Sequence, residues 1–260
     1  INDWNIRPQA AVFWLLPLFL LIIGIYDQGR GRLLLAVFPV GLIIWVNCHG
    51  TFPIGLATIG LWLVDRVWQT LSGEISHSRD DQKKEILTAL LALGAASLAC
   101  LLNPRGAGII EYIRTLTTNP VVQNLVPEWM PPSFEDLAVT PILLGLMFTA
   151  AVLAVSPRRP TAFQLLAFLT FGLLGLKTSR GIIWFGLVMA PTLAEHLTHI
   201  ARELRLEETA YRAHTTLTHT INMVFAGLLI LSGVLDSRRH ESALPLPAKK
   251  AGLISRETPI

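Results

Sequence analysis

Eight apolar runs follow one another along the chain and constrain its fold more than any other feature of the sequence. Their approximate bounds are 10–26, 33–47, 51–64, 86–102, 137–155, 162–176, 181–197 and 221–235. A helix that crosses a bilayer needs about 20 apolar residues, within a range of about 17–25. We expect the shorter runs to recruit flanking polar residues or to lie in a thin part of the bilayer. The pattern predicts an all-α protein, a polytopic bundle of transmembrane helices.

Composition supports this prediction, because the chain has few charged residues with which to cover a soluble domain. Hydrophobic residues make up 52% of the 260 residues and charged residues 15%, whereas a soluble domain has about 25% charged residues. The apolar content excludes intrinsic disorder, and the presence of only two cysteines excludes a disulfide scaffold. The net charge of +3 comes from Lys and Arg scattered between apolar runs, so we expect no nucleic-acid partner.

The distribution of Lys and Arg predicts how the helices would be oriented. The segments richest in these residues are 27–32, 65–85, 156–160 and 198–220. They alternate with less basic segments, and by the positive-inside rule we expect them on the cytoplasmic side. The loop 103–136 and the polar tail 236–260 then lie outside. We therefore predict a multi-pass protein of the inner membrane, with membrane lipid around a multispan domain at 1–235.

Polar residues gather at the ends of runs that this orientation places on the outer face. Asn47 and His49 interrupt the apolar stretch between the second and third runs, and Gly50 permits a tight reversal of the chain. His49 could carry a proton, bind a phosphate or form a structural hydrogen bond. The alternative is that Asn47 and His49 cap the helix ends at the turn. Their spacing alone leaves both interpretations open.

A second polar group follows the fourth run. Asn103, Pro104 and Gly106 together form a helix terminator, which does not account for Arg105, a cation able to face an anionic partner. The segment 108–116 has its isoleucines at helical spacing and its charges on the opposite face. It predicts an amphipathic helix that lies on the outer membrane surface.

Glu128 and Trp129 lie in a segment that three prolines make rigid. Trp129 suits the aromatic belt of a membrane interface, and it could alternatively stack on the apolar face of a sugar ring. Glu128 could act as a general base, bind a metal ion or accept a hydrogen bond from a sugar hydroxyl. It could equally be a carboxylate that only contacts solvent.

The turn 177–180 places two cations and two hydroxyls within four residues. Lys177 and Arg180 suit a phosphate or diphosphate, and the alternative is that they pair with lipid headgroups at the helix ends. Arg7 precedes the first run on the same predicted side. This shared side favours an outward-facing site for an anionic ligand. Histidine and cysteine show no metal-binding spacing, so no cofactor is assigned, and a divalent metal stays open.

The order of these motifs resembles a known group of proteins. The motifs are Arg7-Pro-Gln, Trp45-x-Asn47-x-His49-Gly50, Asn103-Pro-x-Gly106, Glu128-Trp129-x-Pro-Pro and the basic turn with Arg180. They resemble a group of bacterial polytopic membrane proteins that is similar to the GT-C glycosyltransferase superfamily. The resemblance covers residues 7–197. Cys48 and Arg105 stand where the group usually has other residues.

The resemblance implies an enzyme that moves a sugar from a polyprenyl-phosphate donor to an acceptor at the outer face of the bacterial cytoplasmic membrane. Lys177 and Arg180 would stabilise the leaving phosphate, and Arg7, Asn47, His49 and Trp129 would complete the binding site. GT-C enzymes have their catalytic acid in a first extracytoplasmic loop, which we expect upstream of Ile1, because the chain resembles a C-terminal fragment. Glu128 is the candidate acid within this chain. The alternative functions are a transporter or flippase, and a non-catalytic membrane subunit.

Overall fold

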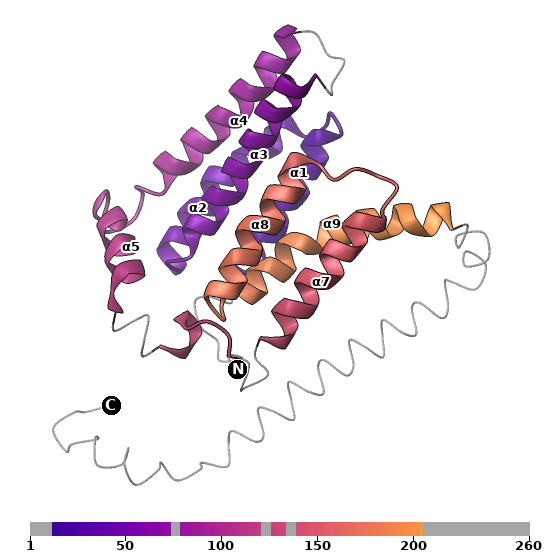
Figure 1. Cartoon of the computed structure of the whole chain (residues 1–260). Helices are drawn as coiled ribbons and strands as arrows, with labels where there is room; N and C mark the ends of the chain where they lie inside the picture. The colour runs from indigo at the N-terminus through magenta and orange to yellow at the C-terminus, as the bar shows by residue number, and fades with distance from the viewer. Residues whose placement is uncertain (1–11, 74–78, 121–125, 134–138, 205–260) are drawn as a thin grey trace, which may run out of the picture. The chain divides into compact units, whose positions relative to one another are not determined.

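The computed structural model describes residues 12–73, 79–120, 126–133 and 139–204. These residues form eight α-helices and two short 3-10 helices, and no strand (Figure 1). The helices are α1 (Leu15–Asp27), η2 (Arg32–Ala36), α2 (Val37–Cys48), α3 (Phe52–Ser72), α4 (Arg79–Ala99), α5 (Gly108–Thr118), η3 (Pro127–Trp129), α7 (Thr140–Val155), α8 (Ala162–Lys177) and α9 (Gly181–Glu203). The all-helical content agrees with the predicted class. The run 221–235, the tail 236–260 and Arg7 lie outside the described residues.

The predicted transmembrane bundle is wrong, and so is the predicted multi-pass location in a bacterial inner membrane. None of the helices in the described ranges combines the length and the apolar character that crossing a bilayer requires. Helices α1, α2, α7 and α8 have 13, 12, 16 and 16 residues. At about 1.5 Å per residue they are shorter than the roughly 30 Å of hydrocarbon. The longer helices α3 and α9 carry charged residues, including Asp65 and Glu195.

The helices begin and end where the local sequence provides the required groups. Thr161 starts α8 with a capping box, in which its side chain accepts a hydrogen bond from the backbone of Gln164 and the Gln164 side chain accepts one from Thr161. Helix α3 has a proline in its first turn and ends at Gly73, whose φ of 67° is left-handed. These boundaries bring Thr51 and Lys177 to one end of the bundle and Thr161 to the other.

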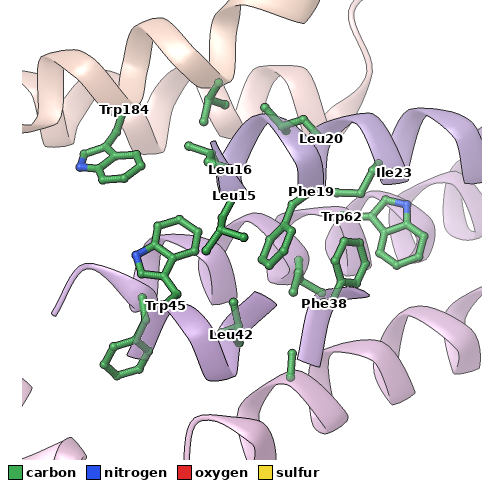
Figure 2. Close-up of a cluster of buried hydrophobic side chains, with 14 of the residues drawn as sticks. Leu15, Leu16, Phe19, Leu20, Ile23, Phe38, Leu42, Trp45, Trp62 and Trp184 are labelled. Carbon is green, nitrogen blue, oxygen red and sulfur yellow. The ribbon is translucent and has the colours of Figure 1, made fainter. Parts of the chain in front are cut away.

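Helix α1 lies in the middle of the core, between α2, α3 and α9 (Figure 2). Aromatic rings from these helices pack against one another, because ring edges and faces attract each other at such distances. Phe19 of α1 meets Phe38 edge to face at 5.0 Å. Trp45 of α2 stacks on Trp184 of α9 at 5.7 Å. All four rings are almost fully buried, so the core fixes how α2 and α9 are placed relative to each other.

The chain has more apolar residues than this core buries. Many leucines lie on the outward faces of the helices, where they are exposed to solvent. They include Leu87, Leu90, Leu91 and Leu98 of α4 and Leu165, Leu169, Leu173 and Leu176 of α8. The low charged fraction thus reflects apolar surface on α4 and α8 as well as a buried interior.

Candidate functional site

Most of the predicted site residues lie at one end of the bundle, which we call the site end. It is formed by the turn between α2 and α3 (His49 to Thr51), the turn between α8 and α9 (Lys177 to Arg180), and η3. Arg180 forms an ion pair through Nη2 with Oε2 of Glu128, and the side chains are 22% and 18% exposed. The Nε of Arg180 is buried and has no hydrogen-bond partner among the described residues. This guanidinium therefore keeps a donor that the fold does not use.

Backbone hydrogen bonds join η3 to the turn between α8 and α9. The N–H of Arg180 donates to the carbonyl of Glu128 at 3.2 Å, and the N–H of Ser179 donates to the carbonyl of Met130 at 3.0 Å. The Ser179 hydroxyl donates to the same carbonyl at 3.1 Å. These three bonds place the segment Glu128–Met130 beside the turn that carries Arg180, and Trp129 within this segment is half-buried.

His49 is held by its neighbours in a short chain of hydrogen bonds. The indole Nε1 of Trp45 donates to Oγ1 of Thr51 at 3.1 Å. That Oγ1 lies 2.9 Å from Nδ1 of His49, and the backbone N–H of Thr51 donates to the same Nδ1 at 3.2 Å. Burial lowers the pKa of His49, and the positive charge of Arg180 lowers it further. His49 therefore belongs electrostatically to the site of Arg180, whereas Thr51 was missed by the sequence prediction.

Asn47 is occupied by the protein itself. Its Nδ2 donates to the carbonyl of Ile43 at 2.8 Å and to the carbonyl of Leu102 at 2.9 Å. An amide nitrogen has two hydrogens, and both are used. Asn47 thus ties the end of α2 to the segment that follows α4, which agrees with the capping alternative.

The segment after α4 turns sharply and leads into α5. The side chain of Asn103 donates to the carbonyls of Cys100 and Gly106 and accepts from the N–H of Arg105. The guanidinium of Arg105 lies 4.9 Å from the ring centroid of Tyr112, a cation–π contact. Helix α5 forms as expected, and its side chains at 112, 113 and 116 lie around Gly50, so α5 covers the turn that carries His49.

An apolar groove of about 330 Å³ runs between α3 and α8 to the site end. Its lining residues are Pro53, Ile54, Ala57, Thr170, Phe171, Leu173, Leu174 and Lys177. The α3 wall begins two residues after Thr51, and Lys177 on the α8 wall lies three residues before Arg180. The groove therefore includes the last turn of α8, and Lys177 at its edge lies in the turn that leads to Arg180.

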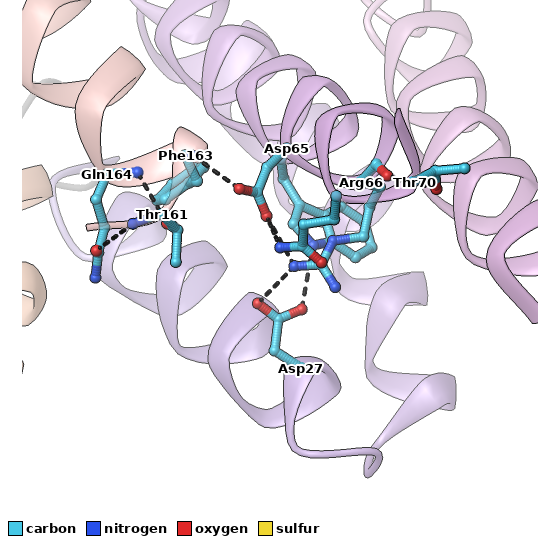
Figure 3. A network of polar contacts seen from close by, with 9 residues as sticks. Asp27, Asp65, Arg66, Thr70, Thr161, Phe163 and Gln164 are labelled. Carbon is cyan, nitrogen blue, oxygen red and sulfur yellow. Dashed lines mark hydrogen bonds and ion pairs between the residues drawn. The ribbon is translucent and has the colours of Figure 1, made fainter. Parts of the chain in front are cut away.

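A buried polar network that the sequence prediction missed lies at the opposite end, which we call the network end (Figure 3). Asp65 is 2% exposed, and its Oδ2 accepts from Nη2 of Arg66 at 2.8 Å and from Gln69 at 2.6 Å. Its Oδ1 accepts from the N–H of Phe163, in the first turn of α8, at 2.9 Å. Arg66 also pairs with Asp27 at 3.3 Å. Burial raises the pKa of Asp27, and the positive charge of Arg66 lowers it by a smaller amount.

A second network at that end surrounds His196, which is fully buried. Its Nδ1 lies 2.7 Å from the hydroxyl of Ser156, and its Nε2 lies 3.1 Å from Oε1 of Gln164. Gln164 donates to Glu195, which pairs with Arg158 at 2.6 Å. Burial lowers the pKa of His196. The sequence signal for this network is a histidine within a largely apolar helix.

No group of three or more His, Cys, Asp or Glu side chains in the described ranges could hold a metal ion. A comparison of the chain with protein-family models, curated proteins and solved structures finds no match. The side chains of the site end and the groove beside it therefore carry the argument for function.

Proposed function

We propose that the site end binds a lipid-linked sugar phosphate of the polyprenyl-phosphate type and acts in the transfer of its sugar. The observation that carries this proposal is the apolar groove lined by Lys177, which lies three residues before Arg180 of the Glu128–Arg180 pair. A hydrocarbon chain with an anionic head has the same division into an apolar body and a charged end. The groove and the cations thus match the two parts of one ligand.

The volume of the groove suits a section of a hydrocarbon chain. A methylene group is similar in size to a water molecule, which takes about 30 Å³ in the liquid, so 330 Å³ accommodates on the order of ten such groups. Burying each methylene contributes about 0.8 kcal/mol. A prenyl chain would gain affinity from the groove even where most of the chain stays outside it.

The residues around the mouth of the groove can receive the phosphate and the sugar. Lys177 would bind the phosphate, and Arg180 would use its unoccupied Nε donor to stabilise the charge that grows on the phosphate as it leaves. Trp129 offers a ring on which a sugar can stack. In the transfer, a hydroxyl oxygen of the acceptor forms a bond to C1 of the sugar while the bond from C1 to the phosphate oxygen breaks, and the proton of the hydroxyl passes to the released phosphate. Because Arg180 engages Glu128, we assign Glu128 to holding Arg180.

Binding of a radiolabelled polyprenyl-phosphate sugar by the full chain tests this proposal. Lys177→Met should weaken binding about tenfold or more, because a charge-assisted hydrogen bond contributes about 1.5–3 kcal/mol. Ala57→Phe should weaken it too, by filling the groove. Lys84→Met alters a 70% exposed lysine of α4, and Ala151→Phe alters an exposed alanine of α7, so both should bind normally.

Transfer of the label to an acceptor fraction is the second readout. We expect transfer by the unmodified chain and its loss in Lys177→Met and in Arg180→Gln. Equal binding by Lys177→Met and Lys84→Met would contradict the proposed ligand site. Tight binding without transfer to any acceptor would leave a lipid-phosphate binding protein and contradict the enzymatic part.

A further inference from the structure

We infer that Thr51 holds His49 as a neutral imidazole with its proton on Nε2, so that His49 donates a hydrogen bond to an oxygen of the bound ligand and takes no proton from it. The inference deepens the proposed function, on which it depends only for the identity of the ligand. It assigns Thr51 as a positioning residue that acts through His49.

The first step is the direction of the hydrogen bond between Trp45 and Thr51. An indole nitrogen can only donate, so Oγ1 of Thr51 accepts the bond from Trp45. The indole cannot turn away, because Trp45 is fully buried and stacked on Trp184. The hydroxyl of Thr51 therefore directs its own hydrogen elsewhere, and Nδ1 of His49 lies 2.9 Å away.

The second step is the state of Nδ1. The backbone N–H of Thr51 also points at this nitrogen, at 3.2 Å, and a backbone N–H can only donate. A hydrogen on Nδ1 would face this N–H directly. Nδ1 of His49 is therefore the acceptor of two hydrogen bonds, and a neutral imidazole with Nδ1 as acceptor has its proton on Nε2.

The surroundings favour the neutral ring. Burial and the charge of Arg180 both lower the pKa of His49, and Arg180 is itself oriented by Glu128. Within the described part of the chain, no residue forms a hydrogen bond with Nε2 of His49. The N–H at this position is thus available to a ligand. Of the roles that the sequence allows for His49, this geometry supports the structural hydrogen bond through Nδ1 and the phosphate ligand through Nε2, and it does not support the proton carrier.

Nitrogen NMR of the full chain labelled with ¹⁵N-histidine tests the inference, because protonated and unprotonated ring nitrogens have widely separated resonances. The His49 signals are assigned by their loss in His49→Gln. At pH 7 we expect an unprotonated Nδ1 and a protonated Nε2. Thr51→Val removes the hydroxyl donor and should raise the midpoint at which His49 takes up a second proton. Thr58→Val removes a hydroxyl of α3, the helix that follows Thr51. This hydroxyl donates to Ile54, so its removal should change neither signal.

Addition of dodecyl phosphate tests the donor role. The Nε2 resonance of His49 should move in a saturable way, and Lys177→Met should shift the midpoint of that titration to a concentration about tenfold higher or more. A protonated Nδ1, a doubly protonated ring at pH 7, or an Nε2 that does not respond to saturating dodecyl phosphate would overturn the inference. Absence of sugar transfer with all these signals as expected would contradict the proposed enzymatic function and leave the inference standing.

Discussion

The two histidines with lowered pKa show how neighbouring groups decide what an imidazole can do. Gln164 donates through Nε2 to Glu195, so its Oε1 is the oxygen that faces His196. Nε2 of His196 must therefore donate, and Nδ1 accepts from the hydroxyl of Ser156. Both ring nitrogens of His196 are used within the fold. His49 uses only Nδ1 within the described part of the chain, so its Nε2 remains for another partner.

Both histidines should make the protein less stable in weak acid. Their folded pKa values lie below the ordinary value of 6.5, so the unfolded chain binds protons more readily than the folded one. The free energy of unfolding therefore rises with pH between the folded pKa values and about 6.5. In the other direction, this contribution to stability is lost as the pH falls from about 6.5 through the folded pKa values. We expect the free energy of unfolding, measured by urea denaturation, to fall between pH 7 and pH 5.

The variants His49→Gln and His196→Gln identify the source of this loss. Each should reduce the fall in stability over the same pH interval, and the double variant should reduce it most. Asp27 acts in the opposite direction, because its pKa is raised and its contribution to stability is lost as the pH rises. The free energy of unfolding is therefore compared between variants at the same pH. An identical fall in all four proteins would contradict the assignment to these two histidines.

At the scale of the element, the crossing of α8 and α9 depends on one glycine. A Cβ on Gly181 would lie 2.2 Å from the carbonyl oxygen of Leu174 and 2.6 Å from the backbone nitrogen of Gly175. Backbone atoms cannot move aside as a side chain can. Gly181 therefore lets α9 begin against the last turn of α8, and this contact fixes the position of Arg180.

Gly181→Ala should accordingly destabilise the protein by about 3 kcal/mol, near the upper end of the usual cost of overpacking. Gly186→Ala is the matched control, since it lies in the same helix and a Cβ there meets nothing within 4 Å. It should stabilise the protein by about 0.5–1 kcal/mol through helix propensity. Urea unfolding measures both variants. A similar effect of the two substitutions would show that the close crossing is not required.

The sequence predicts the helices better than it predicts their surroundings. Runs of apolar residues locate α2, α3 and α8, because such a run is a property of the local sequence. It does not show that Asp65, within α3, is buried. The backbone N–H that donates to its carboxylate there belongs to Phe163, 98 positions away. The transmembrane prediction was wrong because such long-range polar contacts allow charged residues within long helices.

The candidate site was predictable in the same limited way. Lys177 and Arg180 share a turn, so their proximity is local, and their chemistry suggests an anion. The hydrogen bonds that join Arg180 to Glu128 and Ser179 to Met130 span about 50 positions of sequence, and no local pattern encodes them. Thr51 lies only two residues from His49, yet its role depends on the orientation of Trp45 in the core.

At the scale of the whole described bundle, its two ends are built differently. The site end has a groove, an unused Nε donor on Arg180 and, by our inference, an N–H on His49 that can donate to a ligand. The network end has its charged groups paired across helices, with Asp65 joining α3 to α8 and Arg66 joining α3 to α1 (Figure 3). The network end therefore joins α1, α3 and α8 through charged side chains, while the proposed ligand site lies at the other end.

Asp65→Asn tests this division. Asp65 receives three donors on its two oxygens, and an amide would turn an NH₂ group toward at least one of them. Breaking a buried charge pair costs about 3–5 kcal/mol when one partner is removed, and because the amide keeps one acceptor oxygen we expect a loss of about 3 kcal/mol. Asp81→Asn alters an exposed pair with Lys84 and should cost less than about 1 kcal/mol.

Hydrogen exchange shows whether the loss involves the whole bundle. Because Asp65 and Arg66 connect α1, α3 and α8, the amides near the network end of all three helices should lose protection together in Asp65→Asn. Under the proposed function dodecyl phosphate binds at the other end, so it should restore part of this protection by mass action while the local contacts of Asp65 stay broken. Loss of protection confined to the first turn of α8 would show that Asp65 only caps that helix. The aromatic core, and not Asp65, would then hold the helices of the bundle together.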